Sequence, residues 1–203
     1  ENQHFPFPPP ANPLGYLKYT YTASEIQPDM LNADITQTTD SPSWGGLYLQ
    51  YFEKFDQVQQ QKGILSVTKK LFIEKIGSDG KQELLPLGKE KLKTGDKVIT
   101  RLTLSLKQDM DFLYLKDFRS ACFEPIGQLS GNQWKFGTVY YEESKDAVTN
   151  FFFNSLAKGT YVLEYPVWVN QAGTYQDGIA TFQSMYAPEY TAYSEAGKIT
   201  VTK

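Results

Sequence analysis

The chain of 203 residues carries 20 basic and 23 acidic side chains, and its net charge of −3 gives no electrostatic basis for binding nucleic acid. Aromatic residues make up 15% of the chain and charged residues only 21%, which favours a folded, β-rich protein over a solvated helical one. No apolar run approaches the ~20 residues that a transmembrane helix needs, so we expect no direct membrane insertion in this stretch.

The first residues have the composition of an extended, irregular segment. Five of the nine residues in 5–13 are proline, which cannot form regular ladders. The chain also begins without the basic start and apolar centre of a signal peptide. Two hypotheses therefore stay open at this point: a cytosolic protein, or a piece of a longer exported one.

Two short strands and one ambiguous run are expected next. Residues 16–22 and 33–38 contain the Tyr, Thr and Ile residues that pleated strands favour. The apolar run at 47–55 fits a strand or a short helix, because its period does not decide between them.

A domain boundary is predicted where the apolar pattern stops. From residue 56 to residue 63 polarity rises and apolar residues nearly vanish. Length is only a soft prior on domain number, and it allows one large sandwich or two smaller units. We predict two domains, residues 1–62 and residues 63–203.

The chain after the boundary alternates in the manner of half-buried strands. Residues 64–76 suit a long strand, the Asp-Gly pair at 79–80 suits a hairpin turn, and residues 83–87 supply its return. Residues 97–106 are the clearest amphipathic strand, and residues 112–118 predict another.

The last stretch, residues 149–203, is a series of short β-type runs separated by glycine-centred turns, two of which carry the sequence Gly-Thr-Tyr. Between residues 161 and 170 the odd positions are apolar and the even positions are mixed. This pattern predicts a strand with one face packed on a core and the other face partly exposed to solvent. Pro166 predicts an edge position or a bulge, because proline cannot donate to a ladder.

Strands at this spacing predict an all-β fold. Turn signals recur roughly every 10 residues, which is typical of an antiparallel, immunoglobulin-like β-sandwich with about seven strands from Gly63 onward. Residues 140–146 carry the only local charge pattern that favours a helix or a turn.

Histidine and cysteine offer little catalytic chemistry. His4 is the only histidine and lies among terminal prolines, so a Ser-His-Asp or Cys-His device is not favoured. Cys122 is the only cysteine, which excludes an internal disulfide, and its apolar neighbours favour a buried, protonated thiol. These counts also exclude a metal site built from Cys and His.

Two groups of carboxylates are the remaining candidates for metal or acid–base chemistry. One group is Asp109 with Asp111, and the other is Glu142, Glu143 and Asp146. Neither has the glycine-spaced loop of a dedicated calcium site, so turn capping and solvation are favoured over function. We predict no catalytic, cofactor-binding or metal site and no cofactor.

The aromatic residues leave a choice between two functional classes. Trp44, Trp134 and Trp168 could form a sugar-stacking platform, but aromatic residues at period two more often form core and cross-strand pairs. An exposed aromatic patch would equally suit packing against another domain. A carbohydrate-binding or adhesin-like sandwich is therefore the alternative to a module that contacts other domains.

An ordered set of aromatic and glycine-centred motifs runs from Trp44 to Val201. Its members are Trp44-Gly45-Gly46-Leu47-Tyr48 with Tyr51-Phe52, Gly95-Asp96, Asp109-Met110-Asp111-Phe112, Asp117, Phe123-Glu124-Pro125, Tyr140-Tyr141-Glu142, Asn150-Phe151-Phe152-Phe153, Leu156 with Lys158-Gly159-Thr160-Tyr161, Gly173-Thr174-Tyr175 and Met185-Tyr186-Ala187-Pro188-Glu189. In this order the motifs resemble the C-terminal end of bacterial alpha-2-macroglobulin-like proteins, closest to those of Bacteroidetes-type bacteria.

The resemblance implies that residues 63–203 are the terminal macroglobulin-like sandwich of a longer chain. It implies that residues 1–62 are returning strands of a CUB-like or companion β domain, complete or incomplete. Members of this family are exported to the periplasm or cell envelope and are thought to trap proteases. The expected partners are thus other domains of the same chain and, through the full-length protein, target proteases.

The same resemblance limits what this stretch can do. Some family members attach the protease through a Cys-Gly-Glu-Gln thioester, and that motif is missing here, so no such role passes to Cys122. The sequence therefore predicts a non-catalytic structural or interaction module rather than an enzyme.

Overall fold

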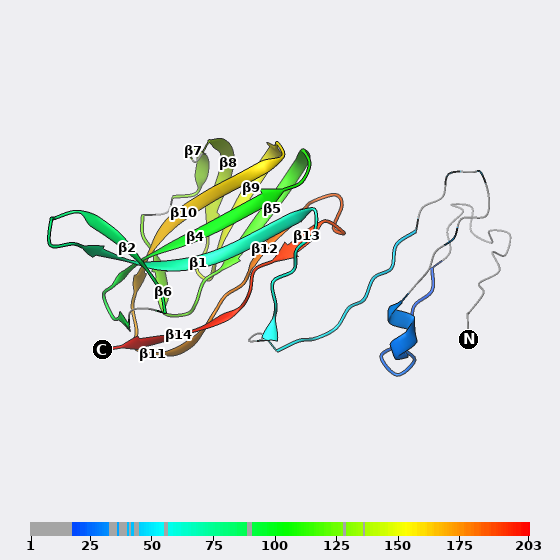
Figure 1. Ribbon diagram of the computed structural model, residues 1–203, viewed down its shortest axis with the longest axis horizontal. Coiled ribbons are helices and arrows are strands. Elements are labelled where there is room, and N and C mark those ends of the chain that lie inside the picture. The colour runs from blue at the N-terminus through cyan, green and yellow to red at the C-terminus, as the bar shows by residue number, and fades with distance from the viewer. Residues whose placement is uncertain are drawn as a thin grey trace. The chain divides into compact units, whose positions relative to one another are not determined.

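The computed structural model of the chain describes residues 18–32, 36, 40, 42, 45–54, 57–88, 91–127, 129–135 and 137–203. The chain divides into two compact units, residues 1–50 and residues 51–203. Figure 1 shows the strands of the second unit as arrows.

The described part of the first unit holds one short 3-10 helix, η1 (Pro28–Leu31), and no strand. The strand predicted at 16–22 is wrong over its described part, residues 18–22, where the backbone is irregular and Tyr19 and Tyr21 are exposed. Favourable strand residues do not suffice, because a ladder also needs a neighbouring strand. Of the strand predicted at 33–38, all but Thr36 lies outside the described residues.

The apolar run predicted at 47–55 as strand or helix is neither over its described part, residues 47–54, whereas Phe55, where the helix could follow, lies outside the described residues. Residues 47–54 are irregular, and the large side chains among them are exposed. The reason is the same as for the preceding segment, since no ladder in the described part of the chain includes these residues.

The second unit is the predicted all-β sandwich. One sheet has five strands in the order β2-β1-β4-β10-β6, a second has six in the order β13-β12-β5-β9-β8-β7, and a third has three in the order β11-β14-β3. All pairs are antiparallel except β14 with β3. Within the described residues the fold has fourteen strand segments instead of about seven, because several are only two to five residues long.

The bounds of the strands are β1 (Leu65–Ile76), β2 (Gln82–Pro86), β3 (Leu92–Lys93), β4 (Lys97–Leu106), β5 (Met110–Phe118), β6 (Phe123–Pro125), β7 (Gly131–Lys135), β8 (Thr138–Ser144), β9 (Val148–Leu156), β10 (Gly159–Val169), β11 (Gly173–Asp177), β12 (Ala180–Ser184), β13 (Thr191–Tyr193) and β14 (Gly197–Thr202). In Figure 1, β1, β4 and β10 run side by side as the centre of one layer.

Several strands confirm the sequence patterns directly. β1 and β4 match the predicted strands at 64–76 and 97–106, and the β1–β2 hairpin turns at Gly80, whose φ is 79°. In β10 the odd positions from Leu163 to Val169 are buried, whereas Val162 and Trp168 are exposed.

The edge position or bulge predicted from Pro166 is met only locally, because β10 is the fourth of the five strands in its sheet. On one side β10 pairs with β4 along nearly its whole length, and on the other it pairs with β6 only over Val167–Val169. The helix or turn pattern at 140–146 is wrong over most of its length, because β8 continues to Ser144. Pairing of β8 with β9 overrides the local charge pattern.

The inner faces of the two larger sheets form the core. Alternate residues of β1, β4, β5 and β9 point inward and are almost fully buried, so the core rests on period-two burial from both layers. The inward residues include Val67, Leu102, Leu104, Leu115 and Phe153.

Candidate functional site

Of the single histidine and the single cysteine of the chain, the structure describes only the cysteine. His4 and Trp44 lie outside the described residues. Cys122 is fully buried, and burial raises the pKa of its thiol, which also donates a weak hydrogen bond to the Ser120 hydroxyl at 3.4 Å. A protonated thiol without access to solvent is a core residue, as predicted, and not a nucleophile.

The candidate carboxylates are not brought together. Asp109 accepts a hydrogen bond from the backbone N–H of Lys158 at 2.7 Å, which caps the turn between β9 and β10. Glu142 is buried, and burial raises its pKa, whereas its neighbour Glu143 is oriented to the opposite face of β8 and accepts from Asn150 at 2.8 Å. Across the described residues, no three His, Cys, Asp or Glu side chains gather as metal ligands would.

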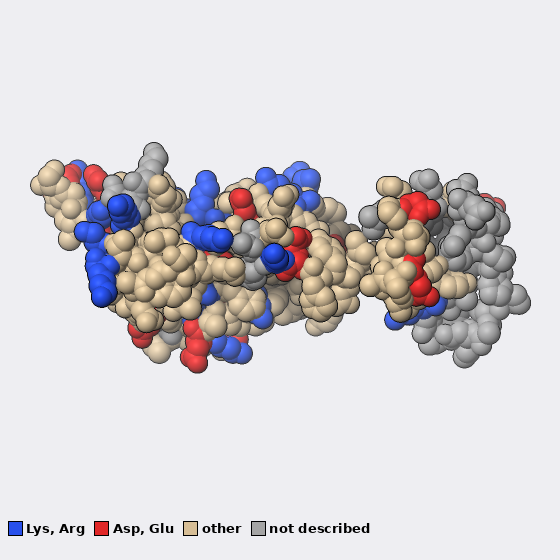
Figure 2. Space-filling view, turned by 90° about the horizontal axis from the view of Figure 1, so that it is seen from below, with Lys and Arg blue, Asp and Glu red and all other residues tan. Residues whose placement is uncertain are grey.

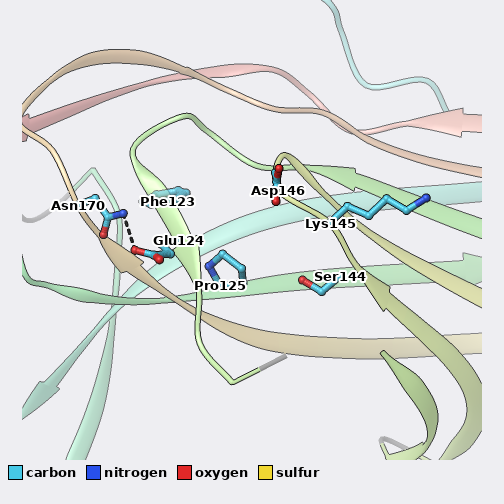
Figure 3. Close-up of a pocket in the computed structure, with 7 residues that line it drawn as sticks. All are labelled: Phe123, Glu124, Pro125, Ser144, Lys145, Asp146 and Asn170. Carbon is cyan, nitrogen blue, oxygen red and sulfur yellow. Dashed lines mark hydrogen bonds between the residues drawn. The ribbon is translucent and has the colours of Figure 1, made fainter. Parts of the chain in front are cut away.

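An open pocket of about 410 Å³ lies beside β6 and the turn between β8 and β9. It is lined by Phe123, Glu124, Pro125, Ser144, Lys145, Asp146 and Asn170. Figure 3 shows the Lys145 side chain extending away from Glu124 and Asn170, which bond to each other at 2.7 Å. Because these polar groups do not converge on one point, the pocket offers no catalytic arrangement.

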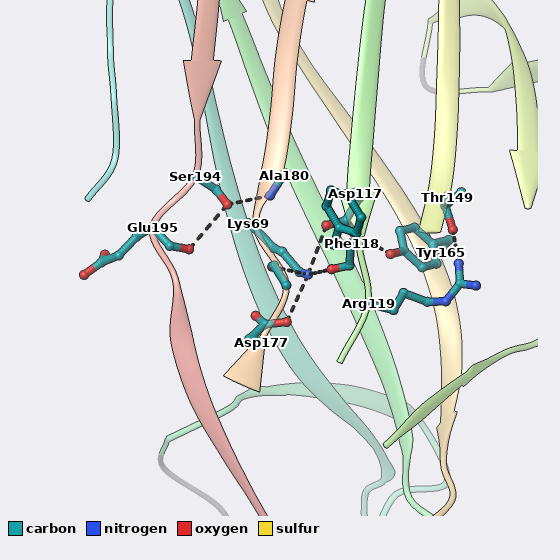
Figure 4. A network of polar contacts seen from close by, with 11 residues as sticks. Lys69, Asp117, Phe118, Arg119, Thr149, Tyr165, Asp177, Ala180, Ser194 and Glu195 are labelled. Atoms are coloured by element: carbon teal, nitrogen blue, oxygen red, sulfur yellow. Dashed lines mark hydrogen bonds and ion pairs between the residues drawn. The ribbon is translucent and has the colours of Figure 1, made fainter. Parts of the chain in front are cut away.

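A buried ion cluster lies between the layers (Figure 4). The ammonium of Lys69 lies 3.0 Å from a carboxylate oxygen of Asp117 and 3.0 Å from one of Asp177. It also donates to the backbone carbonyls of Phe118 and Gly178, each at 2.8 Å. The side chain of Lys69 is 2% exposed and that of Asp117 is fully buried.

Neighbouring polar groups extend this cluster. The Tyr165 hydroxyl donates to the second oxygen of Asp117, and the Arg119 guanidinium donates to the Thr149 hydroxyl and to the backbone carbonyl of Asp146 at 2.8 Å. Lys69 thus faces the two carboxylates inside the fold, whereas Arg119 is held by Thr149 and a backbone carbonyl, and these ion pairs and hydrogen bonds satisfy most of the buried charge.

The pKa directions agree with an ion-paired cluster. Burial lowers the pKa of Lys69, but the charges of Asp117 and Asp177 more than reverse this, so it lies above the usual value. Burial raises the pKa of both carboxyl groups against the opposing effect of Lys69. Burial and the neighbouring Asp117 raise the pKa of Tyr165 well above its usual value.

The cluster joins all three sheets. Lys69 comes from β1 in the five-stranded sheet, Asp117 from β5 in the six-stranded sheet, and Asp177 from β11 in the three-stranded sheet. Its position between strands of different sheets indicates that the cluster holds the sheets in register.

The sequence held a signal for this cluster that the pattern analysis missed. Lys69 stands in the middle of the inward face of β1, between Val67 and Leu71, and Asp117 follows Leu115 on the inward face of β5. A charged residue at an inward position demands a buried partner, although its identity depends on long-range pairing.

The outer face of the six-stranded sheet carries an apolar strip, defined as Tyr114, Trp134, Val139, Tyr141 and Phe152. Val139 pairs with Trp134, and Tyr141 pairs with Phe152, which in turn pairs with Tyr114, so these side chains share one face. The ring centres of Tyr141 and Phe152 are 6.2 Å apart, and those of Phe152 and Tyr114 are 5.0 Å apart.

The outer face of the five-stranded sheet is mixed, because it carries ion pairs as well as the exposed side chains of Val162 and Trp168. Arg101 donates to Glu164 and also lies 4.4 Å from the centre of the Phe72 ring, and Lys97 pairs with Glu74 at 2.8 Å. Figure 2 shows acidic and basic side chains interspersed on the face in view, in several places next to each other, with uncharged surface between them. The two outer faces of the sandwich therefore differ in chemistry.

Comparison with known proteins identifies the sandwich. The family model described as the bacterial alpha-2-macroglobulin MG10 domain matches residues 65–189, which is more than half of the chain. No curated protein matches the chain.

Solved alpha-2-macroglobulins share the fold. A mutant protein from Salmonella has a TM-score of 0.55 at 20% identity over 72% of this chain and 10% of its own. The Escherichia coli protein activated by porcine elastase has a TM-score of 0.55 at 18% identity over 72% of this chain and 14% of its own. The native Escherichia coli protein from domain MG7 to the C-terminus has a TM-score of 0.52 at 18% identity over 71% of this chain and 24% of its own. At such identities the likeness shows the fold.

The present chain spans only about a tenth of the length of the first of these structures. The family match, by contrast, covers nearly the whole β-sandwich, from the first residue of β1 to the loop after β12. The chain therefore belongs to the bacterial alpha-2-macroglobulin family, of which it carries an MG10 domain.

Proposed function

We propose that this chain is a non-catalytic structural and interaction module of a protease-trapping alpha-2-macroglobulin-like protein, which acts as an endopeptidase inhibitor. The match to the MG10 domain over residues 65–189 carries the proposal. It is supported by two similar structures, those of the Escherichia coli protein activated by trypsin and by porcine elastase. The functional surface of such a module is a domain interface.

The module contributes by holding its neighbours in one arrangement until a protease cleaves the longer chain. A sandwich whose sheets are fixed together by buried ion pairs moves as a rigid body, so cleavage shifts domain packing rather than the fold of the module. The shift follows from contacts that differ between the two arrangements.

The longer protein acts in the periplasm or cell envelope, to which it is exported. Two of the similar structures come from Salmonella and Escherichia coli, which are bacteria with two membranes, and this supports export of the longer protein. In the described part of the chain, no helix is long and apolar enough to cross a membrane. The resemblance to the Bacteroidetes-type group stays a prediction.

Residues 1–62 belong to a second β domain that needs strands from elsewhere in the longer chain. The observation behind this proposal is the exposure of the run at 47–52, where Leu47 is 67%, Tyr51 68% and Phe52 105% exposed. Adjacent large apolar side chains are normally covered in a soluble protein.

Limited proteolysis of the isolated chain tests this division. We expect rapid cleavage before about residue 57 and a resistant fragment that contains β1 to β14, because the irregular segment lacks ladder hydrogen bonds. Mass spectrometry of the fragments locates the cuts. Two resistant fragments of comparable lifetime would contradict the incomplete domain.

Protease protection by the longer protein tests the proposed function. We expect the intact protein to shield a bound protease from a large inhibitor, and a form that lacks residues 63–203 to lose most of this shielding. A catalytically dead protease serves as control, because it cannot trigger the rearrangement. Equal shielding by both forms would refute a role for the module.

The carbohydrate-binding alternative keeps one supporting observation. Trp134 and Trp168 are exposed, and Tyr141, Phe152 and Tyr114 form an aromatic row near Trp134. Trp134 and Trp168, however, belong to different sheets of the sandwich, so they cannot form one platform. Binding of soluble oligosaccharides to the isolated chain would favour this alternative.

A further inference from the structure

We propose that the apolar strip is the surface on which a second folded domain of the same longer chain docks. This inference rests on the proposed function and deepens it, because it names the face through which the module contacts its neighbour. The strip lies on β5, β7, β8 and β9, which are consecutive in the six-stranded sheet.

The strip leaves more apolar surface in water than a solvated sheet face needs. Trp134 is 84%, Val139 62% and Tyr141 43% exposed, while Tyr114 and Phe152 are partly exposed. Buried aromatic side chains each cover on the order of 150–250 Å². Because Tyr141, Tyr114 and Phe152 are already partly covered within the sheet, only the exposed part of each side chain is left for a partner, and the strip supplies part of the apolar centre of an interface that buries roughly 800 Å² on each partner.

The apolar surface continues beyond the strip at the end of β5. Phe112 is 48% and Tyr186 79% exposed, and their rings meet edge to face with centres 5.2 Å apart. Met185 is 43% exposed, and its backbone N–H donates to the carbonyl of Phe112 at 2.9 Å. Tyr, Trp, Phe and Met are the residues that interface centres favour.

Polar side chains border the strip on the side of the β8–β9 turn. The Tyr114 hydroxyl donates to Asn150 at 3.0 Å, Asn150 donates to Glu143 at 2.8 Å, and Lys145 lies 3.2 Å from Glu143. These groups are satisfied among themselves, so a partner can cover the strip without leaving them unpaired. An apolar centre with a polar rim is the usual anatomy of a protein interface.

The difference between the outer faces of the two larger sheets favours the apolar strip as the docking surface. The face of the five-stranded sheet is occupied by the Arg101–Glu164 and Lys97–Glu74 pairs, which suit contact with water. Covering that face would remove partly exposed charges from solvent, whereas covering the strip removes mainly apolar surface.

A folded domain of the same chain is the occupant that the comparisons favour. The matched structures have chains of which this fold occupies only 10% to 24%, so most of each chain lies in other parts. A glycan is less suited, since Val139, Phe112 and Met185 widen the apolar surface beyond the aromatic row, and a pyranose ring gains little from them.

Hydroxyl-radical footprinting with mass spectrometry tests the proposal on the isolated chain and on the longer protein. We expect Trp134 and Tyr141 to be oxidised in the isolated chain and at least fivefold less in the longer protein. Trp168 is the internal control: it is 44% exposed on the other sheet and should be oxidised to a similar extent in both. Equal oxidation of Trp134 in both forms, or protection of Trp168 instead, would overturn the proposal.

Further outcomes separate this inference from its rivals. If no polypeptide longer than this chain exists, the proposed function fails, whereas an exposed strip within a longer protein defeats the docking proposal alone. Protection of Trp134 in the isolated chain by cellohexaose or chitohexaose would assign the strip to a glycan. Protection that rises with concentration, together with a dimer mass, would assign it to a second copy.

A pair of variants adds a test in the longer protein. Trp134→Ser should raise oxidation of Tyr141 severalfold by loosening the docked domain, whereas Trp168→Ser should leave Tyr141 protected. Far-ultraviolet circular dichroism of both isolated variants checks that the sandwich is intact. Unchanged protection of Tyr141 in Trp134→Ser would count against the strip as the docking centre.

Discussion

Replacing Lys69 with Met should lower the free energy of unfolding of the sandwich by about 3–5 kcal/mol. The substitution removes the ammonium that lies 3.0 Å from both Asp117 and Asp177 and leaves their carboxylates buried without it. It also removes the donor to the carbonyls of Phe118 and Gly178. Urea unfolding followed by tryptophan fluorescence measures the loss.

Lys70→Met is the matched control, because Lys70 is the next residue of β1 and is exposed on the opposite face. Its effect should stay within about 0.5 kcal/mol, as for other surface substitutions. Similar losses for Lys69→Met and Lys70→Met would show that the ion cluster does not hold the sheets together.

The cluster also predicts a pH dependence. Because the pKa values of Lys69 and Tyr165 are raised in the folded state, their contribution is fully present below about pH 10, near their ordinary values, and is lost at higher pH. The free energy of unfolding should therefore fall as pH rises above about 10, and less steeply in Tyr165→Phe. Identical alkaline profiles for wild type and Tyr165→Phe would contradict the assigned role of Tyr165.

Replacing Gly178 with Ala should cost roughly 3 kcal/mol or more. A methyl group at this position would lie 2.0 Å from the carbonyl oxygen of Phe118 and 2.4 Å from its carbon. These are backbone atoms of β5, and the same oxygen accepts a hydrogen bond from Lys69, so they cannot move without opening the cluster. Thermal unfolding by circular dichroism would detect a loss of this size.

Gly159→Ala provides the comparison for Gly178→Ala. A methyl group at Gly159 would meet its nearest neighbour at 3.8 Å, an ordinary contact, so the change should stay within about 1 kcal/mol. If Gly178→Ala were as stable as Gly159→Ala, the close approach of the loop after β11 to β5 would be wrong.

The strands that sequence predicted well are those whose burial is decided locally. In β4 one face meets the core along the whole strand, and in β10 one face does so from Leu163 onward, so alternation alone locates them. In residues 18–22 the strand residues are equally favourable, but the described part of that unit supplies no strand to pair with. Strand propensity therefore gives a wrong prediction where pairing with another strand decides whether a β-ladder forms.

The ion cluster and the apolar strip depend on register between distant strands. Asp117 reaches Lys69 only because β5 and β1 face each other across the core, and Asp177 comes from a third sheet. The strip likewise arises from pairing Tyr141 with Phe152 and Phe152 with Tyr114. Sequence spacing records none of these pairings, although the inward position of Lys69 hinted at the first.

The native size of the polypeptide that carries this sequence tests the central claim most directly. An antibody raised against the 203-residue chain should detect, in an extract of the encoding organism, a polypeptide several times longer than this chain. Such a band would support a module within a multi-domain protease trap, in keeping with the tenth of chain length that this fold occupies in the Salmonella protein. A band no larger than about 203 residues would contradict the account.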